Sequence, residues 1–378
     1  MRLRNTGAWQ PGDPPGGRRF VTTHTVEDPL RLASGGSLGP VTMAYESWGE
    51  LDADRGNAVL VLPPLSMTCH ASGPAGPGHP AEGWWNSVIG PGLVLDTDRF
   101  HVVVINCLGG CDGSTGPASA SPDGHPWASR FPALDVSDQV DAEAALADAL
   151  GIARWHAVVG MSIGGARALE WAVSRPERVR ALALVSVSAA TRIEQAGHTV
   201  LELELIRRDP HFHGGDYYEL PEGCGPHDGT ALARGFSHLR YGTDAYWQQR
   251  FGGEDLADDP DGCHERFGGY LLAQGEKVVE RFDANCYLVL SEAAMRASVA
   301  RGRGSVKDAL ARITAAAHVV GFSSDRPYPP EAVRELAEGI PGARVRVIES
   351  DLGHYGFMFA PELIEPELRL AVEQEDPC

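Results

Sequence analysis

Residues 158–172 read VVGMSIGGARALEWA, and this stretch decides the fold. A β-branched run stops at Gly160, a Gly-x-Ser-x-Gly pattern ends at Gly164, and an alanine-rich segment with helical spacing follows at once. This order predicts a strand, a sharp turn and a helix. Glycines flank Ser162 because so tight a turn needs small neighbours, and Gly165 lets the helix pack closely. Such a turn lifts the serine hydroxyl above the edge of a sheet, as in a nucleophile elbow.

Length and charge narrow the class of protein. The 378 residues suffice for one large α/β domain with an inserted subdomain, and for a core that needs no disulfides. The formal net charge of −19 favours solubility and argues against nucleic acid as a partner. Residues 1–19 lack the apolar core of a signal peptide, and no run of 18 apolar residues occurs. We therefore expect a cytoplasmic protein with no membrane contact.

The cysteines and histidines show no metal-binding spacing. The seven cysteines are Cys69, Cys107, Cys111, Cys224, Cys263, Cys286 and Cys378, and none belongs to a Cys-x-x-Cys pair. We expect reduced thiols. His79, His125, His211 and His213 are scattered along the chain, so we expect no metal site and no permanently bound cofactor.

Apolar runs predict a mostly parallel sheet with helices on both faces. Residues 41–49 alternate with a period near two, as in a half-buried antiparallel strand. Residues 58–62 are apolar throughout, as a central parallel strand must be when helices cover both of its faces. Further strands are expected at 102–106, 181–187, 317–322 and 345–348, and helices at 136–150 and near 362–373.

Between the fourth and fifth of these runs the pattern becomes polar and helical. The helical segments are 200–208, 230–239, 278–282 and 287–300. An insertion of this length between strands is typical of a lid over the carboxyl edge of the sheet. We therefore expect an α/β core domain of residues 1–190 and 313–378, and a helical lid subdomain of residues 191–312.

Asp325 and His354 each follow one of the last two predicted strands. A serine hydroxyl becomes a nucleophile when a histidine takes its proton and a carboxylate holds that histidine in the right tautomer. In α/β-hydrolase folds the acid and then the histidine follow the serine, each on a loop after a late strand. We predict the catalytic residues Ser162, Asp325 and His354. Asp351 is the alternative acid, although it shares the loop of His354 and must reach back awkwardly.

Two backbone N–H groups are expected to form an oxyanion hole. One belongs to Ile163, the residue after the nucleophile, and the other to the loop that follows the strand at 58–62. Leu65 is the expected second donor, with Ser66 as the alternative.

Several longer stretches carry a resemblance to a known family. They are residues 73–80, 83–85, 89–92, 108–117, 274–277, 281–285, 302–304 and 324–326, together with the elbow. With these stretches the chain resembles the homoserine O-acetyltransferase family of the methionine route over nearly its whole length. The resemblance implies the α/β-hydrolase fold and a ping-pong transfer, in which the serine takes an acetyl group from acetyl-CoA and a substrate hydroxyl then removes it. It also implies a lid that narrows a tunnel to the serine and often forms a homodimer.

The substrate contacts of the family carry over unevenly. Arg234 matches the arginine that clamps the substrate carboxylate, and Tyr241 matches its companion tyrosine. The acidic residue that normally follows the catalytic histidine and pairs with the substrate ammonium is here Tyr355, which we count among the substrate-binding residues. Ser66-Met67 replaces the usual Thr-Gly of the oxyanion loop, and Met161 the usual glycine before the nucleophile.

These departures leave the acceptor open. The acceptor either keeps a carboxylate, or another anion that Arg234 can hold, and lacks a free amine, or it is homoserine with Asp351 as the pairing acid. Serine is a further alternative acceptor. Three further alternatives stay open: a succinyl donor, a serine esterase in which water takes the acyl group, and a binding protein without catalysis.

Overall fold

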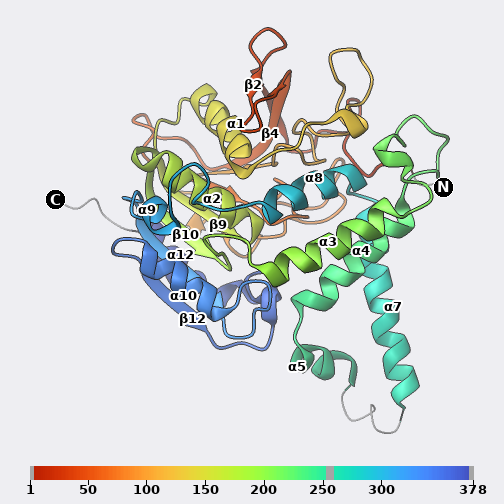
Figure 1. Ribbon diagram of the computed structural model, residues 1–378. Helices are drawn as coiled ribbons and strands as arrows, with labels where there is room; N and C mark the ends of the chain where they lie inside the picture. The colour runs from red at the N-terminus through yellow and green to blue at the C-terminus, as the bar shows by residue number, and fades with distance from the viewer. Residues whose placement is uncertain (1–3, 253–258, 374–378) are drawn as a thin grey trace.

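The computed structural model describes residues 4–252 and 259–373, and its centre is an eight-stranded sheet (Figure 1). The strand order is β1 (Arg19–His24), β4 (Val41–Trp48), β8 (His101–Ile105), β5 (Ala58–Leu62), β9 (Trp155–Met161), β10 (Val179–Val185), β11 (Ala316–Phe322) and β12 (Arg344–Ile348). The six strands from β8 to β12 in this order are parallel, and β4 is antiparallel to both of its neighbours, β1 and β8. The predicted fold class is confirmed. Two small ribbons are β2 (Leu30–Arg31) with β3 (Ser37–Leu38), and β6 (Ile89–Gly90) with β7 (Leu95–Asp96).

Helices cover both faces of the sheet, as the uniformly apolar β5 predicted. Leu60 and Leu62 pack into the cluster that contains α1 (Val136–Ala149), α2 (Ile163–Ser174) and α10 (Pro330–Gly339). Val59 and Val61 pack on the opposite face with α12 (Glu365–Val372). All five side chains of β5 are buried, since alternate residues of a strand point to opposite faces and both faces are covered.

The residues between β10 and β11 are mainly helical. The helices are α3 (Ile193–Arg207), α4 (His227–Tyr241), α5 (Asp244–Trp247), α7 (Pro260–Val279), α8 (Ala284–Met295) and α9 (Val306–Leu310). Figure 1 shows α3, α4 and α7 grouped beside the sheet, with α5 and the far end of α7 extending away from it. α4 packs against both α3 and α7.

The helix expected over residues 278–282 was wrong in its position. α7 ends at Val279, and a new helix, α8, begins at Ala284. The carboxylate of Asp283 caps α8 by accepting from the N–H of Cys286 at 2.9 Å, so the chain restarts a helix there and does not continue the old one.

Short helical turns complete the described chain. They are 3₁₀ turns at Ala128–Arg130, Pro176–Arg178, His213–Gly215, Gly353–Tyr355 and Pro361–Leu363, a π turn at Gln248–Gly252 and the short helix α11 (Gly356–Phe359). No helix in the described ranges is long and apolar enough to cross a bilayer. The six cysteines in those ranges are free thiols, and Cys378 lies outside them.

A buried ion pair joins the elbow helix to its surroundings. Arg167 of α2 donates to Glu143 of α1 at 2.5 Å and to the carbonyl of Pro63 at 3.0 Å, and Trp171 donates to the second oxygen of Glu143 at 2.8 Å. Both charged side chains are almost fully buried. Because Pro63 begins the loop after β5, this pair links the predicted oxyanion loop to the elbow.

Candidate active site

Ser162 lies between β9 and α2 with φ 55°, a conformation that residues other than glycine rarely adopt. Its glycine neighbours are required by space. A Cβ on Gly160 would lie 2.5 Å from the Cβ of Ala168, and one on Gly164 would lie 2.0 Å from the carbonyl oxygen of Leu62. The strand, turn and helix predicted around this serine are therefore present, with the strain that a nucleophile elbow carries.

The structure brings together the three residues that the sequence proposed as catalytic. Nε2 of His354 lies 2.9 Å from Oγ of Ser162, and Nδ1 lies 2.9 Å from a carboxylate oxygen of Asp325. The exposed fractions of Asp325 and His354 are 2% and 5%. Asp325 follows β11 and His354 follows β12, and parallel neighbours deliver their loops to the same edge of a sheet. A serine that is hydrogen-bonded to an oriented imidazole can be activated for attack.

The alternative acid, Asp351, takes a different position. Its side chain is exposed, and its backbone carbonyl accepts a hydrogen bond from the hydroxyl of Thr243. Nδ1 of His354 is already occupied by Asp325. The geometry therefore favours Asp325 as the orienting carboxylate.

Leu65 and Ile163, the predicted oxyanion donors, approach the serine from two sides. Ile163 is the first residue of α2, where the helix leaves an N–H without an intrahelical acceptor. Leu65 lies in the loop after β5 and lines the same cavity as Ser162. Arg281 supports this loop by donating to the carbonyl of Ser66 at 2.6 Å. Their role as oxyanion donors stays a prediction.

A cavity of about 240 Å³ opens above Ser162 and His354. One wall is mainly apolar and comes from the loop after β5 and from α11, and the other comes from helices α4 and α7. The volume lies below the range of about 300–1,000 Å³ that is typical of sites for drug-sized ligands. A small substrate therefore suits this cavity.

Arg234, the predicted carboxylate clamp, lines the cavity from α4 with an exposed fraction of 6%. Its guanidinium carbon lies 5.7 Å from the ring centroid of Tyr241, and its Nε is buried without a hydrogen-bond partner. Tyr241 in turn packs against His354, with ring centroids 5.2 Å apart. A buried guanidinium that faces a cavity is well suited to a carboxylate.

Tyr355, which replaces the acidic residue of the family, lies in the same cavity. Its hydroxyl is hydrogen-bonded to Nδ1 of His238. Burial raises the pKa of Tyr355 well above its ordinary value, and burial, followed by the charge of Arg234, lowers the pKa of His238 to about 2. The pair is therefore neutral. Sequence reasoning missed His238, although it follows Arg234 by four residues and so lies on the same face of α4.

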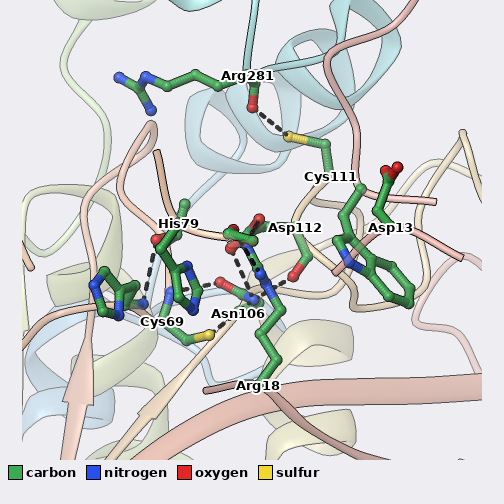
Figure 2. A network of polar contacts seen from close by, with 12 residues as sticks. Asp13, Arg18, Cys69, His79, Asn106, Cys111, Asp112 and Arg281 are labelled. Carbon is green, nitrogen blue, oxygen red and sulfur yellow. Dashed lines mark hydrogen bonds and ion pairs between the residues drawn. The ribbon is translucent and has the colours of Figure 1, made fainter. Parts of the chain in front are cut away.

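Behind the oxyanion loop lies a buried polar network (Figure 2). The side-chain oxygen of Asn106 accepts from the N–H of Cys69 at 2.6 Å, and Arg18 pairs with Asp112. Figure 2 shows Asn106 at the centre of this network, with Cys69 on one side, Asp112 on the other and Arg18 extending towards Asp112. Because Cys69 belongs to the segment that continues from the oxyanion loop, the network holds the far end of that loop.

Glu46, His70 and His79 form part of this network and could supply metal ligands. One oxygen of Glu46 lies 3.0 Å from Nδ1 of His70, and the other lies 2.7 Å from Nε2 of His79. The two imidazoles are stacked 3.8 Å apart and only 5° from parallel. A nitrogen lone pair lies in the plane of its ring, so the lone pairs of parallel stacked rings do not converge on one ion. Sequence reasoning took His79 as isolated, which was wrong, and the absence of a metal stays a prediction.

The network predicts acid sensitivity. Burial lowers the pKa of His79 from 6.5 to about 4, followed by the charge of Arg18. The unfolded chain then takes up a proton that the folded protein refuses, so the free energy of unfolding should fall as pH drops from 6.5 towards 4. Burial raises the pKa of Glu46, so the folded protein takes up this proton more readily than the unfolded chain. Glu46 therefore opposes the fall in the free energy of unfolding at low pH.

We expect His79→Gln to flatten this pH dependence, measured as urea midpoints at pH 7.5 and pH 5. His264→Gln is the matched control, because the His264 side chain is exposed. An equal fall in midpoint for wild type and His79→Gln would contradict this explanation.

Comparison with known proteins agrees with the geometry. A family model described as alpha/beta hydrolase fold matches residues 74–257. A homoserine O-acetyltransferase of Thermobifida fusca (strain YX) is 51% identical over 359 residues, which are 94% of this chain and 94% of that protein. The crystal structure of a homoserine O-acetyltransferase from Bacillus anthracis superposes with a TM-score of 0.84 at 25% identity, covering 95% of this chain and 98% of that one.

The fold is also shared by a hydrolase. The structure of an acetylester hydrolase from Corynebacterium glutamicum has a TM-score of 0.80 at 25% identity, with 95% of this chain and 97% of that chain covered. Fold alone therefore does not separate transfer from hydrolysis. Identity over nearly the whole length does decide the family: this chain belongs to the homoserine O-acetyltransferases, enzymes with the α/β-hydrolase fold.

Proposed function

We propose that the protein transfers an acetyl group from acetyl-CoA, through an ester on Ser162, to the hydroxyl of homoserine or a related small hydroxy acid. The observation that carries this proposal is the hydrogen-bonded series of Ser162, His354 and Asp325 beneath a cavity that contains the buried guanidinium of Arg234. Acetyl-CoA acts as a co-substrate that leaves as CoA. No permanently bound cofactor enters the reaction.

In the first half-reaction Nε2 of His354 takes the proton of Ser162 as Oγ attacks the thioester carbonyl. The oxyanion that forms faces the N–H groups of Leu65 and Ile163. The carbon–sulfur bond then breaks, and His354 returns the proton to the departing thiolate. Asp325 holds the ring in position and stabilises the imidazolium.

In the second half-reaction the acceptor hydroxyl occupies the place of the thiol. Nε2 of His354 takes its proton, the oxygen attacks the acyl carbon, and the bond from that carbon to Oγ of Ser162 breaks as Oγ regains a proton. Arg234 holds the acceptor carboxylate, and Tyr241 packs between Arg234 and His354.

The acyl-enzyme provides the test of this function. Intact mass measured after mixing with acetyl-CoA should show one added acetyl group on Ser162, and succinyl-CoA should add less in the same time. An acceptor should discharge this ester faster than water does. If CoA is released from acetyl-CoA equally fast with and without every acceptor, the protein is an esterase, as its C. glutamicum neighbour is named.

Arg234→Gln should weaken use of the acceptor and leave acylation intact. A hydrogen bond to a charged group contributes about 1.5–3 kcal/mol, so kcat/KM for the acceptor should fall by about 10- to 150-fold. Stopped-flow measurement of acetyl-enzyme discharge at varied acceptor concentration checks this, with CoA release as the acylation readout. Arg234→Lys keeps the charge but loses the planar guanidinium. Its kcat/KM for the acceptor should lie between the values of the wild type and of Arg234→Gln. Equal loss in both half-reactions would contradict a role in acceptor binding.

We also propose that two copies of the chain associate through the lid. α3, α4 and α7 carry exposed apolar side chains, namely Leu201 at 58%, Leu232 at 49% and Leu272 at 55%. Apolar side chains exposed on helices that pack side by side, as α4 does with α3 and α7, favour protein association. Sedimentation velocity should show a dimer for the wild type and a monomer for Leu201→Asp combined with Leu272→Asp. A monomeric wild type would contradict the proposal.

A further inference from the structure

The cavity above Ser162 holds positive side chains and no acid. Arg234 is buried in it, Arg281 is partly buried, and Lys277 is exposed at its edge. Among the residues that line it within 4–252 and 259–373, none is an aspartate or glutamate. Asp325 lies behind His354 and is already bonded to that ring. The side chains that meet a bound acceptor therefore carry a net positive charge. Glu202 and Asp112 lie outside the lining and offset part of the charge of Arg234 and Arg281.

The positive groups lie near enough to one another to interact. Burial, and after it the charge of Arg234, lowers the pKa of Arg281. The pKa of His238 is lowered by burial and then by Arg234, Arg281 and Lys277 in turn. Like charges in a partly dry cavity repel, and an anion placed among them relieves that repulsion. A net negative acceptor is thus favoured over a neutral one.

An ammonium group on the acceptor finds no carboxylate among the described residues that line the cavity. The side chain of Asp351, the acid near His354 in sequence, is exposed. The hydroxyl of Tyr355 is bonded to His238. The side chains of Ser66, Tyr241 and Gln274 can accept a hydrogen bond from an ammonium group but do not balance its charge. A buried cation without an anionic partner is unfavourable.

The aromatic rings of the cavity do not replace the missing acid. Guanidinium carbons of Arg234 and Arg240 already lie 5.7 and 5.9 Å from the ring centroid of Tyr241. Tyr355 stacks on Phe359, with centroids 4.7 Å apart and an interplanar angle of 18°. The rings are thus engaged by existing cations and by each other, and they offer an ammonium little of the attraction that a free aromatic face provides.

We propose that the natural acceptor is a small hydroxy carboxylic acid that carries no ammonium group, with its carboxylate on Arg234 and its hydroxyl at His354. This inference rests on the acyl transfer proposed above and adds the chemical class of the acceptor. The hydroxyl loses its proton to Nε2 of His354, a new carbon–oxygen ester bond forms, the ester bond to Ser162 breaks, and the proton passes to Oγ.

The test compares two acids that differ only in the amine. Acetyl-enzyme is prepared with acetyl-CoA and freed of CoA, and its discharge is followed by intact mass with L-homoserine or with 4-hydroxybutyrate, which is homoserine without its amino group. We expect 4-hydroxybutyrate to discharge the ester at least about tenfold faster at equal subsaturating concentration, a difference of about 1.4 kcal/mol.

Two variants isolate charge as the cause. Met358 lines the cavity from α11 and is partly buried, so Met358→Glu places a carboxylate there and Met358→Gln places a neutral side chain of the same shape. Relative to Met358→Gln, Met358→Glu should shift the rate ratio towards homoserine by about tenfold. Circular dichroism confirms that both variants are folded, and their discharge is compared on acetyl-enzyme that is fully formed before the acceptor is added.

The outcomes separate the two proposals. If no acetyl group appears on Ser162, acyl transfer itself fails. If the acetyl-enzyme forms but homoserine discharges it as fast as 4-hydroxybutyrate or faster, or if neither acid exceeds water, the acceptor class is overturned while the acyl-enzyme stands. A rate ratio that is the same in Met358→Glu and Met358→Gln also overturns the electrostatic explanation.

Discussion

Ser162→Ala is expected to remove the covalent intermediate and to lower kcat by about 10⁴- to 10⁶-fold, the range seen when the nucleophile of a serine triad is lost. The physical reason is that Oγ of Ser162 is the oxygen that Nε2 of His354 reaches, at 2.9 Å, and that the elbow raises towards the cavity. Intact mass with acetyl-CoA should show no adduct, and single-turnover CoA release should be near the rate without enzyme.

Ser174→Ala is the matched control for this loss. Ser174 is also on α2, but its hydroxyl donates to the carbonyl of Glu170 one turn earlier and takes no part in the cavity. The Ser174→Ala protein should form the acetyl adduct and release CoA at the wild-type rate. If an acetyl adduct forms on the Ser162→Ala protein at the wild-type rate, the nucleophile is another residue. That result would contradict the proposed mechanism.

Asp325→Asn is expected to lower kcat by about 10⁴-fold with little change in stability of the fold. An amide in this position can present an N–H to Nδ1 of His354, which favours the tautomer that can no longer accept the serine proton at Nε2. The pre-steady-state rate of CoA release measures the loss. Because Nε2 of His354 can then no longer take the serine proton, hydroxide must remove it, and the remaining activity should rise with pH.

Asp351→Asn tests the competing acid with the same chemical change. The Asp351 side chain is exposed, and Nδ1 of His354 is occupied by Asp325. The kcat of Asp351→Asn should therefore stay within about twofold of the wild-type value, as for an ordinary surface substitution. The assignment is wrong if Asp351→Asn loses as much activity as Asp325→Asn.

The fold was largely predictable because its signals are local. The elbow depends on glycines at fixed offsets from Ser162, and the central strands depend on apolar runs whose length and period are visible in the chain. The order serine, aspartate, histidine followed from the loops after successive strands. The exception was residues 278–282, where α7 ends at Val279 and the cap formed by Asp283 begins α8.

The sequence by itself determined the elbow, the parallel sheet and the two strand ends that carry Asp325 and His354, because backbone geometry and side-chain period act over a few neighbouring residues. Only the tertiary structure decided which carboxylate contacts His354, that Arg234, His238 and Arg281 surround one cavity without an acid, and that His70 stacks on His79. These features depend on packing between segments far apart in the chain, so their distances are set only when those segments come together in the folded protein.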